Sequence, residues 1–168
     1  MNKVLIIGIV ASGKTTLAQH LSLSTGIPWF ELDSIVHHQI ESIRIKRTAD
    51  EQAEVISHID RQGAWIMEGT DRASYQFLYD MADIIIFLDP LLWKRKLRIF
   101  TRYLKQKLGI EPCHYKPDLK MLRLMYQWTR DFEQNRPAFE YKLRSYGLKV
   151  IRLTDNRPSR SDKLLRRP

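Results

Sequence analysis

The sequence predicts an α/β fold in which helices cover both faces of a five-stranded parallel sheet. Short apolar runs alternate along the chain with segments whose apolar residues recur at helical spacing. The runs are almost continuously apolar, which is typical of parallel strands buried on both faces. A glycine-rich loop also joins the first predicted strand to the first predicted helix. With 168 residues, we expect one domain covering positions 1–168.

The N-terminal quarter of the chain predicts two strands separated by a helix. Residues 3–7 form a β-branched run that indicates a buried strand. Apolar residues at 17, 18 and 21 then suit an amphipathic helix. The sequence Gly-Ile-Pro at 26–28 ends this helix, and residues 29–32 predict the second strand.

The rest of the chain predicts three more strands and a long helical insertion. Apolar residues at helical spacing indicate a helix at about 49–62, and strands are expected at 64–67, 84–88 and 148–153. The stretch from about 91 to 146 is long, helical, and rich in basic and aromatic residues. A crossover between strands needs only one helix, so we expect two helices that form a lid at the carboxyl edge of the sheet.

The loop after the first strand fits the phosphate-binding pattern G-x-x-x-x-G-K-[ST]. Glycines allow successive backbone N–H groups to point into one concavity, and the helix start adds further donors. Lys14 is expected to reach the β- and γ-phosphates, and the Thr15 hydroxyl to ligate Mg²⁺. A glycine-rich turn without a ligand is the alternative, and the flanking strand and helix argue against it. The residues expected to bind ATP are Gly8, Ala11, Ser12, Gly13, Lys14, Thr15 and Thr16.

Three acidic residues follow predicted strands, where a doubly wound sheet places its ligand. Asp33, Glu68 and Asp89 come directly after the second, third and fourth strands. An Mg²⁺ ion on Thr15 usually has a second carboxylate from a strand end. Glu68 and Asp89 both fit this pattern, and either could instead cap the following helix.

The composition limits the partners and the compartment. The formal net charge is +9, which attracts nucleotides, nucleic acids and anionic membranes without choosing among them. Cys113 is the only cysteine, so an internal disulfide is excluded and a cytoplasmic location is expected. No apolar run approaches the roughly 20 residues that span a bilayer, and we expect no membrane partner.

Several collinear stretches resemble the adenylate-kinase-like group of P-loop kinases, and most closely the bacterial family of DNA-topology modulation proteins. The resemblance implies a three-layer α/β/α P-loop NTPase fold with the helical lid. Its sheet order is 2-3-1-4-5, with strands numbered along the chain. It also implies transfer of the γ-phosphoryl group of ATP to a nucleotide or another small acceptor. The matching stretches are 5–8 with 13–18, 27–28 with 32–33, 65–69, 82–89, and 130 with 135–137.

The resemblance also implies roles around the acceptor. The segment Glu68-Gly69-Thr70-Asp71-Arg72 stands where adenylate kinases have Asp-Gly-Phe-Pro-Arg. Glu68 would then hold Mg²⁺-bound water, and Arg72 would hold the phosphate of the acceptor. Asp33 stands where related small-molecule kinases place a carboxylate that orients the acceptor or accepts its proton. The Phe-Pro pair is missing here, which puts the identity of the acceptor in doubt.

Basic residues of the expected lid are candidates for catalysis and substrate binding. Arg98 and Arg102 lie four residues apart and so share one helix face. By resemblance, Arg98 would stack on adenine and Arg102 would contact the transferring phosphoryl group. Arg130 and Arg136 would bind substrate from the returning helix. A solvated basic helix is the alternative reading of all four.

A different class of function also fits the sequence, namely nucleotide-dependent binding of DNA or RNA. Aromatic residues interleave with the basic ones in the insertion, which can provide stacking platforms for bases. At helical spacing, the same residues instead favour packing of the two lid helices against each other. They are Trp93, Phe100, Tyr103, Tyr126, Trp128 and Phe132.

Overall fold

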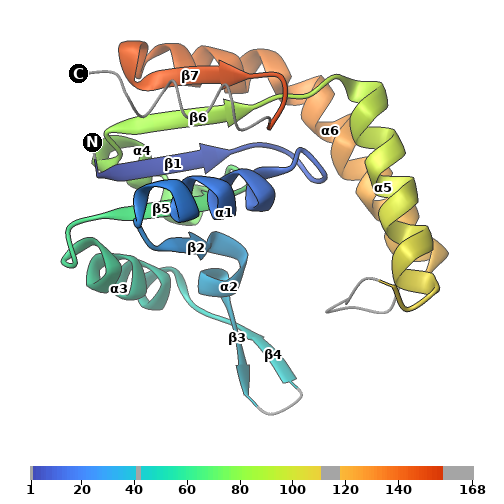
Figure 1. The fold of residues 1–168 in the computed structure, drawn as a ribbon, viewed down its shortest axis with the longest axis horizontal. Helices are drawn as coiled ribbons and strands as arrows, with labels where there is room; N and C mark the ends of the chain where they lie inside the picture. Colours follow the sequence, from blue (N-terminus) through green and yellow to red (C-terminus); the bar gives the residue numbers. More distant parts are fainter. Residues whose placement is uncertain (1, 41–42, 111–117, 157–168) are drawn as a thin grey trace.

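The structure, a computed structural model, describes residues 2–40, 43–110 and 118–156. Its main sheet contains five parallel strands in the order β2-β5-β1-β6-β7, with β1 at the centre (Figure 1). The central strand pairs with β5 on one side and β6 on the other, which brings the phosphate-binding loop to the middle of the sheet edge. The strands are β1 (Lys3–Ile7), β2 (Trp29–Glu31), β5 (Trp65–Gly69), β6 (Ile84–Leu88) and β7 (Val150–Leu153).

Two further strands were not predicted. β3 (His37–Ile40) and β4 (Ile43–Lys46) form an antiparallel hairpin that is separate from the main sheet (Figure 1). The five predicted strands neighbour one another as expected, but counted along the described chain with the hairpin included, the order of the main sheet is 2-5-1-6-7 and not 2-3-1-4-5. The difference arises because the two hairpin strands, each only four residues long, precede the third predicted strand.

Capping interactions mark the C-terminus of α1 and the N-terminus of α3. α1 ends at Gly26, whose φ of 74° lets its N–H bond the carbonyl of Ser22. α3 begins with a capping box in which the side chains of Thr48 and Glu51 bond each other's backbone N–H. The helices are α1 (Lys14–Thr25), α2 (Leu32–Val36), α3 (Ala49–Asp60), α4 (Leu78–Met81), α5 (Leu92–Lys107) and α6 (Leu119–Arg144), and the 3₁₀ turns are Ala73–Tyr75 and Gly147–Lys149.

The core has two parts, one on each face of the sheet. Alternate residues of a strand point to opposite faces, so Leu5 and Ile7 contact one part while Val4 and Ile6 contact the other. The first part packs against α2, α3, α4 and the C-terminal half of α6. The second packs against α1, which lies over the sheet in Figure 1. The arrangement is the expected three-layer α/β/α fold.

The segment from Leu91 to Tyr146 contains the two expected helices of the insertion. Figure 1 shows α5 running away from the sheet and α6 running back beside it. The C-terminal half of α6 is anchored by Phe139, whose ring centroid lies 5.1 Å from that of Phe87 on β6. Among the described residues, no helix is both long and apolar enough to span a bilayer. Closure of this helix pair over a ligand stays a prediction.

Candidate active site

The loop between β1 and α1 has a conformation suited to binding phosphate groups. Ala11 and Gly13 both have positive φ, 58° and 99° respectively. Alternating handedness of this kind turns successive N–H groups toward one concavity, at the start of a 12-residue helix. A methyl group on Gly8 would lie 2.6 Å from the carbonyl oxygen of Leu88, so only glycine fits where the loop crosses β6.

Two buried polar groups in the loop, the Ser12 hydroxyl and the Lys14 ammonium, are not fully satisfied by hydrogen bonds or ion pairs within the described part of the protein. The Ser12 hydroxyl is buried and has no hydrogen-bond partner among the described residues. Lys14 Nζ donates to the carbonyl oxygen of Ile9 at 3.1 Å. Burial lowers the pKa of Lys14, although Glu68 and Asp33 partly oppose this effect. A polyphosphate in the loop would stabilise the charged form of Lys14 and offset its burial.

The Thr15 hydroxyl and the Glu68 carboxylate meet beside the loop. Thr15 Oγ1 donates to Glu68 Oε1 at 2.6 Å. The contact follows from the sheet, because Glu68 on β5 pairs with Ile6 on β1 just before the loop. Burial raises the pKa of Glu68, and nearby Lys14 and Thr15 offset only part of the increase. A hydroxyl oxygen and a carboxylate oxygen are the hard ligands that Mg²⁺ prefers, so these residues fit the predicted ion.

Asp89, the other candidate for Mg²⁺, is held in an ion-pair cluster. Arg136 donates to both of its carboxylate oxygens, at 2.9 and 3.0 Å, and Arg152 Nε donates to Oδ2 at 3.0 Å. Burial alone would raise the pKa of Asp89, but the bonds from the two arginines lower it. Of the two carboxylates, Glu68 is therefore the one that contacts the loop hydroxyl.

Besides the Phe132 ring, Arg136 contacts carboxylates, and none of these contacts is to the phosphate-binding loop, Asp33 or Arg72. Besides Asp89, its guanidinium bonds Glu133 at 2.9 Å and Glu140 at 3.4 Å. It thus ties α6 to the end of β6, and its predicted contact with substrate stays a prediction. Sequence analysis missed Arg152, although an arginine inside an otherwise apolar strand was a visible signal of a buried partner.

Asp33 and Arg72 form the other polar part of the sheet edge. Arg72 Nη2 lies 2.7 Å from Asp33 Oδ1, and both side chains are partly exposed. A methyl group on Gly69 would lie 2.8 Å from Leu32 Cβ, so glycine allows the close approach of α2 that places Asp33. The charge of Asp33 influences the pKa of both Lys14 and Glu68, which puts this pair in electrostatic contact with the loop.

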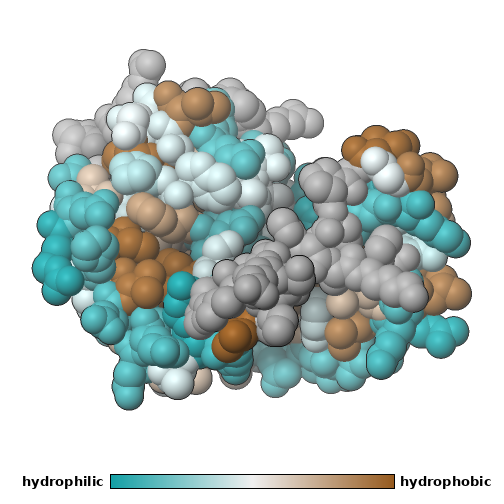
Figure 2. Space-filling model, turned by 90° about the horizontal axis from the view of Figure 1, so that it is seen from below, coloured by the Kyte–Doolittle hydropathy of each residue, from teal (hydrophilic) through white to brown (hydrophobic). Residues whose placement is uncertain are grey.

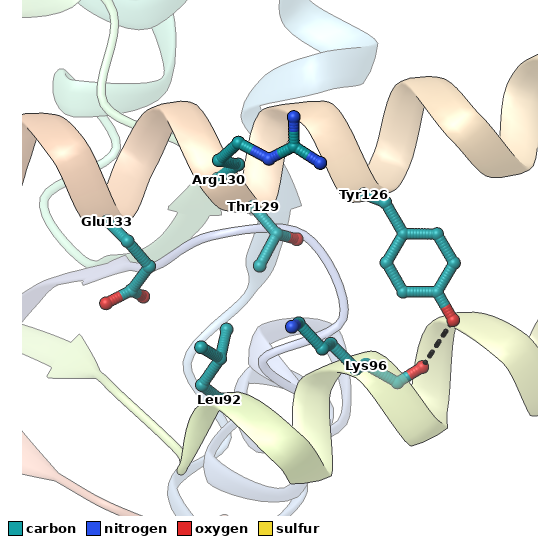
Figure 3. Close-up of a pocket in the computed structure, with 6 residues that line it drawn as sticks. All are labelled: Leu92, Lys96, Tyr126, Thr129, Arg130 and Glu133. Atoms are coloured by element: carbon teal, nitrogen blue, oxygen red, sulfur yellow. Dashed lines mark hydrogen bonds between the residues drawn. The ribbon is translucent and has the colours of Figure 1, made fainter.

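The four basic residues predicted on the insertion separate into two groups. Arg98 Nη1 donates to the carbonyl oxygen of Ser12 at 2.7 Å, so α5 contacts the loop directly. The positive charge of Arg102 lowers the pKa of Lys14, which is consistent with a position near the loop. Arg130 instead lines a hollow between α5 and α6, and the loop residues are not among those that line it (Figure 3).

The end of β7 also approaches the loop. A methyl group on Gly13 would lie 3.0 Å from Asn156 Nδ2 and 3.4 Å from Arg98 Nη1. Asn156 thus lies next to Gly13 of the loop, and sequence analysis gave it no role. Its position after the last strand, at the carboxyl edge of the sheet, was the available signal.

Comparison with known proteins identifies the fold. No family model and no curated protein matches the chain. A shikimate kinase from Acinetobacter baumannii in complex with shikimate has a TM-score of 0.62 and 14% identity, over 98% of this chain and 91% of that one. The chain has the same fold as this kinase. A sugar kinase from Janibacter sp. HTCC2649 has a TM-score of 0.55 and 19% identity, over 98% of this chain and 92% of that one. Deoxyadenosine kinase from M. mycoides with bound dATP has a TM-score of 0.51 and 15% identity, over 97% of this chain and 96% of that one.

These similarities confirm part of the expectation drawn from the sequence. The chain shares its fold with these three kinases, because the alignments cover nearly the whole of each chain. At identities below 20%, they do not identify the substrate. The resemblance to DNA-topology modulation proteins is not shown by these comparisons and stays an expectation.

Proposed function

We propose that this protein is an ATP-dependent kinase that transfers the γ-phosphoryl group to a small acceptor. The observation that carries the proposal is the 2.6 Å contact between Thr15 and Glu68 beside a loop of phosphate-binding geometry. A glycine-rich turn without a ligand would have no need to bring a hydroxyl, a carboxylate and the ammonium of Lys14 together. The kinase fold of the chain supports the same assignment.

The nucleotide half of the reaction is assigned to the loop and α5. Backbone N–H groups of the loop and Lys14 would bind the phosphate oxygens. Thr15 and Glu68 would hold Mg²⁺, whose charge offsets that of the phosphate groups when it is bound. Arg98 and Arg102 would bring further positive charge from the insertion, and arginines in such positions contribute about 10³–10⁵ in rate.

The acceptor half is assigned to Asp33 and Arg72. A carboxylate can orient a hydroxyl group and accept its proton, and a guanidinium can bind an anionic group of the same molecule. The two side chains pair with each other at 2.7 Å and are both partly exposed. An acceptor that carries a hydroxyl and an anionic group would replace this mutual contact with a hydrogen bond to Asp33 and an ion pair with Arg72.

The test is ADP formation with ATP, Mg²⁺ and a panel of nucleoside monophosphates, nucleosides and small hydroxyl metabolites. We expect one class of acceptor to raise ADP formation well above the background rate. Lys14→Met should lower that rate by about 100-fold or more, because the terminal phosphates lose their ammonium partner. Lys120→Met removes the same charge from an exposed position on α6 and should leave the rate unchanged. If no acceptor raises ADP formation, the kinase assignment fails.

The finer expectations from the sequence remain proposals. They are membership of the DNA-topology modulation family, a cytoplasmic location, and ATP-dependent binding of nucleic acid as the alternative function. The net charge of +9 supports the alternative. The contacts of Thr15 and Glu68 favour phosphoryl transfer.

A further inference from the structure

The outer face of α5 carries a row of exposed apolar side chains. The members lie three or four residues apart and therefore follow one line along the helix. We call this row the apolar stripe. It comprises Trp93, Leu97, Phe100 and Leu104 of α5 and the C-cap residue Leu108, which are 60%, 53%, 45%, 41% and 72% exposed.

The stripe is distinct from the surfaces that α5 uses inside the molecule. The buried residues of α5 are Arg95, Ile99 and Tyr103, on a different face of the helix. Arg98 points toward the phosphate-binding loop, where it bonds Ser12. At 100° per residue, the centre of the stripe lies well over 90° from both of these faces. Figure 2 shows hydrophobic groups along the outer rim of the right-hand part of the molecule, which is the part formed by α5 and α6 in Figure 1.

The charges beside the stripe are all of one sign. α5 contains seven lysines and arginines and no acidic residue. On a helical projection, Lys94 and Lys105 fall on one side of the stripe, and Lys96 and Lys107 on the other. A second copy of α5 would bring two such basic rows together, which is unfavourable. Charge complementarity therefore selects an anionic partner.

A hollow on the Lys96 side adds a place for an anionic group. It lies between α5 and α6, has a volume of about 220 Å³, and is lined by the cationic residues Lys96 on α5 and Arg130 on α6 (Figure 3). Glu133 also lines it, but that carboxylate is already bonded by Arg95 and Arg136. Leu92 forms part of the apolar wall. A phosphate group with attached hydrocarbon matches this combination of two cations and an apolar wall.

We propose that the apolar stripe of α5 docks on the surface of an anionic lipid bilayer, with the helix lying in the plane of the interface. A helix with Trp, Phe and Leu on one side and Lys on its flanks is typical of such interfacial helices. α5 has 16 residues and is about 24 Å long, and its stripe forms a ridge that suits a planar surface better than a groove. Three of the five stripe residues are leucines, which cannot stack on bases, so the pattern disfavours single-stranded nucleic acid. This peripheral contact differs from the expectation of no membrane partner, which considered only spanning segments.

The experiment is sedimentation of the full chain with vesicles of phosphatidylcholine, with and without phosphatidylglycerol. We expect binding to the anionic vesicles that weakens as salt rises from about 50 to 500 mM. The double variant Leu97→Glu/Leu104→Glu should bind at least about tenfold more weakly, because it places charge in the hydrocarbon boundary. Leu23→Glu on α1 is the matched control, since this leucine is 88% exposed and outside the stripe. It should bind as the wild type does.

Tryptophan fluorescence gives a second measurement. Trp93 should move into an apolar environment, so anionic vesicles should shift the emission of the wild type to shorter wavelength. The shift should be lost in Trp93→Phe, while the other tryptophans remain. Circular dichroism checks that each variant is folded. The proposal would be overturned if the wild type failed to bind anionic vesicles. It would also fail if Leu23→Glu lost as much vesicle binding as the double variant Leu97→Glu/Leu104→Glu. It would also be overturned if the wild type is a dimer that the double variant converts to a monomer, because a second copy would then cover the stripe.

Discussion

Replacing Asp89 with asparagine tests whether the buried carboxylate at the end of β6 anchors α6. The side chain of Asp89 is 6% exposed, and its oxygens accept bonds from Arg136 and Arg152. Asparagine has nearly the same shape but carries no charge and only one side-chain oxygen. Both arginines would therefore lose an ionic partner at a site that excludes most water.

The expected loss of unfolding free energy depends on which partners Arg136 and Arg152 keep after the substitution. Removing one partner of a buried ion pair typically costs about 3–5 kcal/mol. Arg136 keeps Glu133 and Glu140, and the side chain of Arg152 is 52% exposed, so water replaces part of its lost contact. We therefore expect the free energy of unfolding to fall by about 2–3 kcal/mol. For a chain of this size, this corresponds to a fall in Tm of about 4–12 °C.

The assay is urea unfolding of the wild type, Asp89→Asn, Arg136→Gln and the double variant. The double-mutant cycle should give a coupling energy of about 1–2 kcal/mol. Asp131→Asn, an exposed substitution of the same type on α6, should change stability by less than about 0.5 kcal/mol. A coupling energy below about 0.5 kcal/mol would refute the anchoring role. If Arg136→Gln left stability unchanged and raised the KM for an acceptor, the predicted role in substrate binding would be supported instead.

The ion pairs of Asp89 with Arg136 and Arg152 also predict how the stability of the protein depends on pH. The arginines lower the pKa of Asp89 below its ordinary 3.8 in the folded chain. A carboxyl group with a lowered folded pKa stabilises the protein above its unfolded pKa, and this contribution is lost as pH falls through the folded value. Acidification below about pH 4 should therefore narrow the difference in unfolding free energy between the wild type and Asp89→Asn.

Three further predictions follow from the site. Glu68→Gln should weaken the apparent Mg²⁺ affinity in the ADP assay by at least about tenfold. Because burial raises the pKa of Glu68, that affinity should fall in the wild type as pH drops through the raised value, but not in the variant; an unchanged Mg²⁺ requirement would contradict this. Gly69→Ala should push against Leu32, lower the unfolding free energy by about 1–3 kcal/mol and raise the KM for the acceptor more than that for ATP; a wild-type KM would count against the position assigned to Asp33. DNA binding through six or more phosphate contacts should weaken by about 10³ between 50 and 200 mM salt, as measured by fluorescence anisotropy; no binding even at the lower salt would eliminate that alternative.

The nucleotide half of the candidate site could be predicted because it is local in sequence. The phosphate-binding loop, its strand and its helix occupy one continuous segment, so one motif describes all three. The choice between Glu68 and Asp89 could not be predicted in this way. Both follow a strand, and the difference depends on Arg136 and Arg152, which lie 47 and 63 residues from Asp89. Long-range pairs of this kind leave no local pattern.

The helical insertion shows a second reason for incomplete prediction. Its two helices were expected, and packing between them was the favoured explanation of its aromatic residues. Tyr103 is buried as expected, but Trp93, Phe100 and Trp128 are exposed. α5 has buried residues on one face, including Ile99 and Tyr103, and the exposed apolar stripe on another. Helical periodicity alone does not show which apolar residues are buried. The β3–β4 hairpin was missed because each strand is only four residues long; β3 (HHQI) shows no apolar alternation, and the alternation of β4 (IRIK) is too short to identify a strand by itself.

The central place of β1 in the sheet has a consequence for synthesis of the chain. β1 leaves the ribosome first, yet its neighbours pair through Trp65 and Ile84, about 60 and 80 residues later. At bacterial and eukaryotic elongation rates, the wait for β5 alone is about 3–12 s. Throughout that time an almost wholly apolar strand has no sheet to join. Newly made chains should therefore depend on chaperones that shield short hydrophobic segments, and refolding of the intact protein should be slow for its size.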